Sequence, residues 1–289
     1  MQNFTIITDS SSDLTPGLCS QLNVKVLPLS FFIEGKQYYN DPLNPQISHK
    51  DFYKQLSDGK MVTTSALNPE QFREAMEHEL IAGNDVLYLG FSSALSGTYN
   101  AGVLAAEELN EKYPSRKVYT VDTRCASLGQ GLLVYYACLE RDKGKTIEEV
   151  RDYAESIKGS ICHWFTVSDL YQLKRGGRIS GVTAALGTML SIKPVLHVDD
   201  DGRLINMFKA RGRNASILAL FNKMKESAID PKNQTIFISH GDCFDDAKRL
   251  GDKITEEYGC KCVIGYVGPV IGAHSGKGTV ALFFLGKER

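Results

Sequence analysis

Short apolar runs alternate with amphipathic stretches over the first half of the chain. The runs are FTIIT (4–8), VKVLPLSFF (24–32), DVLYLGF (85–91) and KVYTVD (117–122). Each is bounded by polar or turn-forming residues, which is typical of strands buried in a parallel sheet. Between them, PEQFREAMEHEL and GVLAAEELNEKY have the spacing of amphipathic helices. This alternation predicts a parallel sheet covered by helices.

The pattern changes near residue 160, where the strand-like segments become longer and lie closer together. They are ICHWFTVSDL, KPVLHVDDDGRLINMFKA, QTIFISHG and CKCVIGYV. Within the second of them, DDDG (199–202) is a turn signal that predicts an antiparallel hairpin. We therefore expect an α/β fold of two domains. The first, residues 1–159, has a parallel sheet, and the second, residues 160–289, has a mixed sheet.

Polar loops follow several of the predicted strands in the first half. TDSSSD follows the first strand, FSSALSGT follows DVLYLGF, and VDTRCASLGQG follows KVYTV. In open α/β sheets, ligands collect at the carboxyl ends of the strands, where helix amino termini point free amides outward. Three such loops predict a ligand site at this edge.

A fourth polar loop, TTSALNP (63–69), contains a helix start. Asn68 suits the N-cap, Pro69 suits the first turn, and Gln71 suits the third position of a capping box. Capping does not account for Thr63, Thr64 and Ser65, which therefore remain available to a ligand.

Composition narrows the class of protein. The 289 residues are 43% hydrophobic and 23% charged, with a formal net charge of -1, so nothing favours binding to nucleic acid. No signal-like start or membrane-spanning run is present, and we expect a cytoplasmic protein. Seven cysteines do not form a disulfide scaffold, and the C-x-C of Cys260 and Cys262 lacks the companions of a metal site. We therefore expect mostly buried thiols and no bound metal.

Familiar catalytic motifs are missing. Neither GxxxxGK[ST] nor a GxGxxG after the first strand occurs, so we expect no nucleotide cofactor. GxSxG is also absent, but Ser93 or Ser96 could in principle act with His274, which leaves a Ser-dependent lipid esterase as an alternative.

Three stretches of the second half stand out. LKRGGRISG (173–181) is typical of a helix that stops and restarts, and GPVIGAHSGKG (268–278) sets His274 among small residues. Between them, VTAALGTMLSIKPVL is almost uncharged. If helical, it would be buried on most faces or would lie against an apolar ligand.

Eight motifs together carry a family resemblance. They are TDSSSD, TTS, FSSALSGTY, VDTRCASLGQG, DLYQLKRGGRIS, KPVL, RGR and GPVIGAHSG. In this order and spacing, from about Thr8 to Phe284, the chain resembles the DegV family of bacterial fatty-acid-binding proteins. The resemblance implies a two-domain DegV-like α/β fold. One long-chain fatty acid, of the palmitate, stearate or oleate class, would lie in an apolar tunnel between the domains.

The resemblance also implies a carrier role. Such proteins present the acyl carboxylate to a separate fatty acid kinase catalytic subunit, which makes acyl phosphate for phospholipid synthesis. The chain itself would have no catalytic residues and no cofactor besides the bound fatty acid, and it would contact a membrane only transiently. A binder of another apolar carboxylate, such as an isoprenoid or branched acid, remains a further alternative.

Matching the motifs residue by residue gives the implied site. The head-group contacts would be Thr63, Thr64, Ser93 and His274. Arg178, Ser96 and Gly97 would contact the head group or the partner, and Arg211 and Arg213 would lie on the docking side. The chain departs from the family pattern at Ala66, Leu67 and Asn68, and again at Lys277, where a cation is added near the expected carboxylate.

Overall fold

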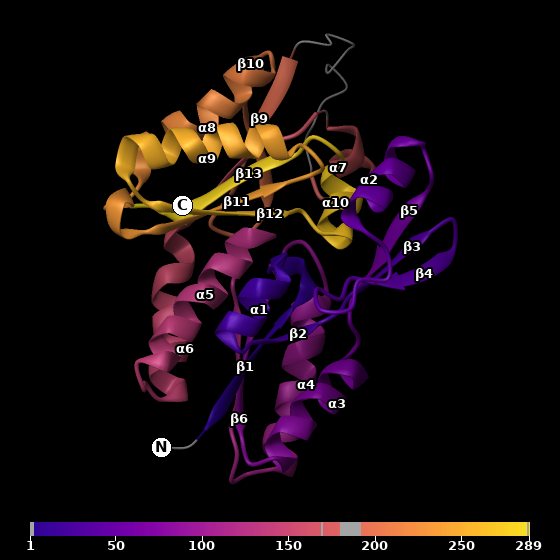
Figure 1. Cartoon of the computed structure of the whole chain (residues 1–289). Helices are drawn as coiled ribbons and strands as arrows, with labels where there is room; N and C mark the ends of the chain where they lie inside the picture. Colours follow the sequence, from indigo (N-terminus) through magenta and orange to yellow (C-terminus); the bar gives the residue numbers. More distant parts are fainter. Residues whose placement is uncertain (1–2, 169, 180–191, 288) are drawn as a thin grey trace.

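The computed structural model describes residues 3–168, 170–179, 192–287 and 289, and its strands form three sheets (Figure 1). The first is parallel, with the order β2-β1-β6-β7. Its strands are β1 (Phe4–Asp9), β2 (Lys25–Leu27), β6 (Asp85–Gly90) and β7 (Val118–Asp122). The predicted parallel sheet is therefore confirmed.

Helices cover both faces of this sheet. They are α1 (Pro16–Leu22), α3 (Pro69–Ile81), α4 (Thr98–Lys112), α5 (Leu128–Asp142) and α6 (Ile147–Ile157). Ile6 and Leu87 pack toward α1, α5 and α6, whereas their neighbours Ile7 and Val86 pack toward α3 and α4. Burial of both faces explains why the strands are continuous apolar runs.

The run 24–32, which we predicted as one strand, is two strands in different sheets. β2 ends at Leu27, and β3 (Ser30–Ile33) belongs to a three-stranded antiparallel sheet with β4 (Lys36–Tyr39) and β5 (Val62–Ser65). Pro28 stands between them and has no N–H for a sheet ladder. The 24–32 prediction is wrong at this proline, and the small sheet that results carries part of the site.

The third sheet is mixed, as predicted, with the order β10-β9-β8-β13-β11-β12. Its strands are β8 (Ile161–Thr166), β9 (Ile192–Val198), β10 (Leu204–Arg211), β11 (Thr235–His240), β12 (Lys261–Tyr266) and β13 (Val280–Leu285). β9 and β10 form the antiparallel hairpin expected around residues 199–202. α8 (Arg213–Ser227) and α9 (Phe244–Tyr258) pack on one face of this sheet (Figure 1).

α5 covers the other face and thereby joins the two halves of the molecule. One hydrophobic cluster includes Leu87 of β6, Leu132 of α5, and Phe165 and Phe283 of the mixed sheet. The boundary expected between residues 159 and 160 falls just before β8, but the core continues across it. Two halves with a shared core hold the sheets at a fixed separation.

Shorter elements complete the fold. These are α2 (His49–Ser57), α7 (Tyr171–Arg175), α10 (Pro269–Ser275), and the 3-10 turns η1 (Ser10–Ser12), η2 (Lys158–Ser160) and η3 (Pro231–Asn233). α7 ends before Gly176 and Gly177, as predicted. The expected restart of the helix and most of VTAALGTMLSIKPVL lie outside the described residues.

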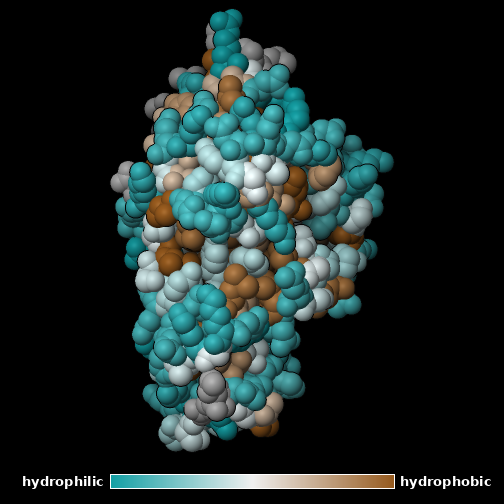
Figure 2. Space-filling view, turned by 60° about the vertical axis from the view of Figure 1, so that its left-hand side comes forward, coloured by the Kyte–Doolittle hydropathy of each residue, from teal (hydrophilic) through white to brown (hydrophobic). Residues whose placement is uncertain are grey.

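The surface, the helices and the cysteines can be compared with what the composition led us to expect. Figure 2 shows mostly hydrophilic ends, with hydrophobic side chains gathered at mid-height between them. None of the helices in the described part of the chain is long and apolar enough to cross a membrane. The seven cysteines form no disulfide and are mostly buried, and no metal-holding cluster of His, Cys, Asp or Glu occurs among the described residues.

Candidate ligand-binding site

A cavity of about 180 Å³ lies between the strand-end loops of the parallel sheet and the mixed sheet. A cavity that holds one water molecule needs only roughly 10–15 Å³, so this one has room for a ligand of many atoms. Most of its wall is apolar, including Leu95, Phe165, Leu173, Leu204, Val270 and Phe283. Such a wall favours an apolar ligand body.

The mixed sheet forms the floor of this cavity. Phe165 of β8 pairs with Ala281 of β13, and Ala281 pairs in turn with Ser239 of β11. Because paired residues point to the same face of a sheet, these three side chains form one row, and all three line the cavity. The floor is thus mostly apolar, with Ser239 and His163 as polar members.

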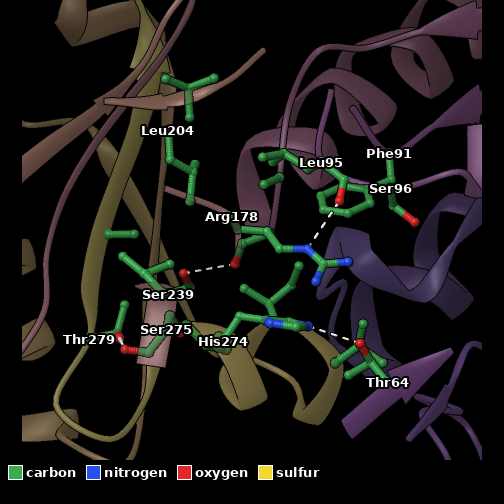
Figure 3. Close-up of a pocket in the computed structure, with 18 of the residues that line it drawn as sticks. Thr64, Phe91, Leu95, Ser96, Arg178, Leu204, Ser239, His274, Ser275 and Thr279 are labelled. Atoms are coloured by element: carbon green, nitrogen blue, oxygen red, sulfur yellow. Dashed lines mark hydrogen bonds between the residues drawn. The ribbon is translucent and has the colours of Figure 1, made fainter. Parts of the chain in front are cut away.

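Polar groups from three parts of the chain meet at one side of the cavity (Figure 3). Thr64 comes from β5, Ser96 and Gly97 from the loop before α4, and His274 from α10. The Nε2 of His274 lies 2.9 Å from the Oγ1 of Thr64. Arg178 lines the same region after the end of α7. We call this group the polar end.

Strand alternation decides which threonine reaches the cavity. Thr64 pairs with Phe31, which is fully buried, whereas Thr63 pairs with Phe32 and is exposed. Neighbouring residues of a strand point to opposite faces, so only Thr64 faces the cavity. Thr63 does not line it.

The serines of FSSALSGT have different partners. The Oγ of Ser92 donates to the carbonyl of Gly202 at 2.9 Å, and the Oγ of Ser93 donates to Asp122 at 2.5 Å. Ser96 accepts from the backbone N–H of Thr98 at 3.2 Å at the start of α4 and also lines the cavity. The structure therefore brings Ser96 and Gly97 to the polar end. It gives Ser93, whose head-group role stays a prediction, a partner outside the cavity.

The electrostatics of the polar end favour an anion. Burial, followed by the positive charges of Arg178 and Arg175, lowers the pKa of His274 to about 4, so this ring is neutral at neutral pH. Arg178 donates to the carbonyls of Leu95, at 3.3 Å, and Gly176, and it forms no ion pair within the described part of the chain. An uncompensated cation beside the amino terminus of α4 attracts negative charge.

Sequence reasoning missed a second polar group in the cavity wall. Ser127 is the N-cap residue just before α5, and its Oγ donates to Asp13 at 2.5 Å and lies 3.0 Å from the Oγ of Ser239. The Oγ of Ser275, at the end of α10, is buried and has no hydrogen-bond partner among the described residues. The one signal in the sequence was the position of Ser239, a single serine at an inward position of an apolar strand.

The remaining expected residues lie away from the cavity. Lys277 pairs with Asp242 at 2.8 Å, so its charge is compensated there. Arg213 pairs with Asp246 at 2.7 Å, and Arg211 is exposed at the end of β10. A docking role for the two arginines stays a prediction.

Known proteins resemble this chain over nearly its whole length. The sequence profile described as "Uncharacterised protein, DegV family" matches residues 3–287. The chain belongs to the DegV family. A DegV domain-containing protein of Clostridium perfringens is 47% identical over 290 residues, which cover 100% of this chain and 99% of the relative.

Solved DegV structures share the fold. A DegV lipid binding protein from Thermotoga maritima is 29% identical, with a TM-score of 0.84 and 99% of each chain covered. A DegV family protein from Thermus thermophilus, named for its fatty acid binding, is 30% identical, with a TM-score of 0.86 over 97% of this chain and 98% of that one. The predicted family and the predicted α/β DegV fold are confirmed.

Proposed function

We propose that this protein binds one long-chain fatty acid, with the carboxylate at the polar end and the acyl chain along the apolar floor. The observation that carries the proposal is the cavity itself. Its wall is apolar, and at one side Thr64, Ser96, Gly97 and His274 lie beside the uncompensated Arg178. The fatty acid binding named for the Thermus thermophilus relative supports the same ligand.

The two parts of the cavity contribute differently to binding. A chain of about fifteen methylenes, at roughly 0.8 kcal/mol each, supplies on the order of 12 kcal/mol before ordering costs. A buried carboxylate is costly unless donors satisfy it, so the polar end offsets that cost and fixes the orientation. The acyl chain therefore dominates affinity, and the polar end decides which end of the ligand faces outward.

We further propose that the protein presents this carboxylate to a separate, cytoplasmic, ATP-using fatty acid kinase subunit. Gly97 and Arg178 are exposed, so the polar end reaches the surface where a partner could approach it. The esterase alternative has less support, because His274 is bonded to Thr64, Ser93 to Asp122, and Ser96 to Thr98. A hydrolase nucleophile would instead be within hydrogen-bond reach of its base.

Native mass spectrometry of the purified protein, followed by extraction of the bound molecule, tests the first step. We expect one fatty acid per chain. An empty protein that fails to take up added fatty acids would rule the proposal out. Recovery of a bound isoprenoid or branched acid would instead show that the ligand belongs to that class. Adding the kinase and ATP should then yield acyl phosphate, whereas turnover of acyl esters by the protein alone would favour the esterase.

Replacing Ser96 by Ala should weaken fatty acid binding by about 10-fold to 100-fold, because a hydrogen bond to a carboxylate contributes roughly 1.5–3 kcal/mol. The Ser93→Ala variant is the matched control from the same loop, and its affinity should change little, since Ser93 is bonded to Asp122. Displacement of a fluorescent fatty acid gives both dissociation constants. A larger loss in the Ser93→Ala variant would place the carboxylate at Ser93 instead.

A Gly176→Ala substitution should disturb His274, although Gly176 itself does not line the cavity. A Cβ at Gly176 would lie 2.2 Å from the Nδ1 of His274, so the ring must move away from Thr64. We expect affinity to fall by about 10-fold, the cost of one hydrogen bond to the head group. Gly17→Ala is the control, because a Cβ there meets no atom within 4 Å. Equal affinities in the two variants would remove His274 from the head-group site.

A further inference from the structure

The cavity contains a second polar group that an unsubstituted acyl chain does not use. Ser127, Ser239 and Ser275, which we call the serine cluster, all line it, and each is at least nine-tenths buried, with exposed fractions of 5%, 0% and 7%. Buried hydroxyls in an apolar wall are costly unless they are hydrogen-bonded. The hydrogen bonds that these hydroxyls form, and those that they leave open, therefore indicate which ligand group this part of the wall can bind.

The hydroxyl protons of Ser127 and Ser239 are already used in hydrogen bonds within the protein. Above about pH 7, where Asp13 is ionised, Ser127 must donate to this carboxylate, because an ionised carboxylate only accepts. Ser239 then donates to Ser127, at 3.0 Å. Within the described part of the chain the Oγ of Ser239 has no other partner, so it keeps a lone pair that can accept from a ligand in the cavity that Ser239 lines.

Ser275 supplies the complementary group. Ser275 lines the cavity, and its buried Oγ has no hydrogen-bond partner among the residues that the structure describes, so its proton is available to a ligand. A hydroxyl both donates and accepts, and it would satisfy Ser239 and Ser275 together. A methylene satisfies neither of them.

The serine cluster is not a second carboxylate site. Where Asp13 is ionised, its negative charge lies directly behind Ser127 and would repel an anion, whereas Arg178 stands at the polar end. Figure 3 shows Ser239 and Ser275 on one side of the cavity and Thr64 and Ser96 on the other. A neutral polar group fits the cluster.

We infer that the serine cluster recognises a hydroxyl group on the acyl chain, so that the preferred ligand is a hydroxy fatty acid. This inference rests on the proposed fatty acid binding and adds the substrate class. A site that hydrogen-bonds a ligand hydroxyl discriminates against the analogue that lacks it, because its own buried groups are then unpaired.

The test compares hexadecanoic acid with a series of hydroxyhexadecanoic acids that differ in the position of the hydroxyl. Displacement of a fluorescent fatty acid from the full chain gives each dissociation constant. We expect one position to bind about 10-fold more tightly than hexadecanoic acid, and this gain should vanish in the Ser239→Ala and Ser275→Ala variants. Ser216→Ala, at a buried serine of α8 outside the cavity, should keep the gain.

The outcomes separate this inference from the proposed function. If hexadecanoic acid binds and no hydroxylated acid binds more tightly, the inference is overturned while the proposed function stands. The inference is also overturned if the gain in affinity survives in both cavity variants. If no acid of the series binds, the proposed function fails and the inference fails with it.

Discussion

An Ala281→Phe variant is expected to fold and to lose more than about 100-fold in fatty acid affinity. Ala281 is central in the row that forms the cavity floor, between Phe165 and Ser239. A phenyl ring there would occupy the space of several methylenes of the ligand. At roughly 0.8 kcal/mol for each methylene, displacing about four of them costs on the order of 3 kcal/mol. The cavity receives the ring, so the overpacking penalty of a filled core is largely avoided.

Binding and folding must be measured together for this variant. Fluorescent displacement gives the dissociation constant, and thermal unfolding in the absence of ligand shows whether the fold is retained. Ala82→Phe adds the same ring at an exposed position after α3 and should leave affinity unchanged. Wild-type affinity in a folded Ala281→Phe protein would place the acyl chain away from β13.

An Asp13→Asn variant is expected to be more stable than the wild type above pH 7. Burial raises the pKa of Asp13 from 3.8 to about 7, although Ser127 and Gly268 donate to it. Below pH 4 this group is protonated in both states. Between pH 4 and 7 the unfolded chain loses the proton and the folded chain keeps it, so stability falls as pH rises, and it levels off above about 7.

The loss over this interval is on the order of 4 kcal/mol, at roughly 1.4 kcal/mol for each unit of pKa. Asparagine does not ionise, accepts from Gly268 as aspartate does, and tolerates the positive φ of 52° at this position. Urea unfolding at pH 4, 6 and 8 should therefore give a flatter pH dependence for Asp13→Asn than for the wild type. Asp58→Asn, at an exposed position after α2, should follow the wild type. Parallel curves for all three proteins would contradict the raised pKa.

Local signals in the sequence predicted local structure well. The capping box of Asn68 and Gln71 is present at the start of α3, and the turn at residues 199–202 joins the predicted hairpin. Each depends on interactions between groups only a few residues apart, so a short stretch of sequence is enough to predict it. The split of the run 24–32 was also readable, because Pro28 cannot donate to a ladder.

Which polar residues reach the cavity depends on groups far apart in the sequence. Thr64 rather than Thr63 faces inward because of the register between β5 and β3. Ser93 is turned to Asp122, which lies 29 residues away. Ser239 meets the ligand space only because Ala281 and Phe165 pair beside it. The sequence predicted that the polar loops would converge. It did not predict which of their side chains would reach the cavity.

The position of α5 between the two sheets has a consequence for ligand exchange. Because this helix packs against strands of both halves, opening the molecule like a hinge would expose the hydrophobic cluster that they share. Uncovering apolar surface of that extent costs far more than loading and unloading a ligand can supply. We therefore expect the proposed ligand to exchange through local movement at the exposed loops of the polar end, with the sheets fixed. The residence time of the ligand is then set by a few loop residues and can change without altering the fold.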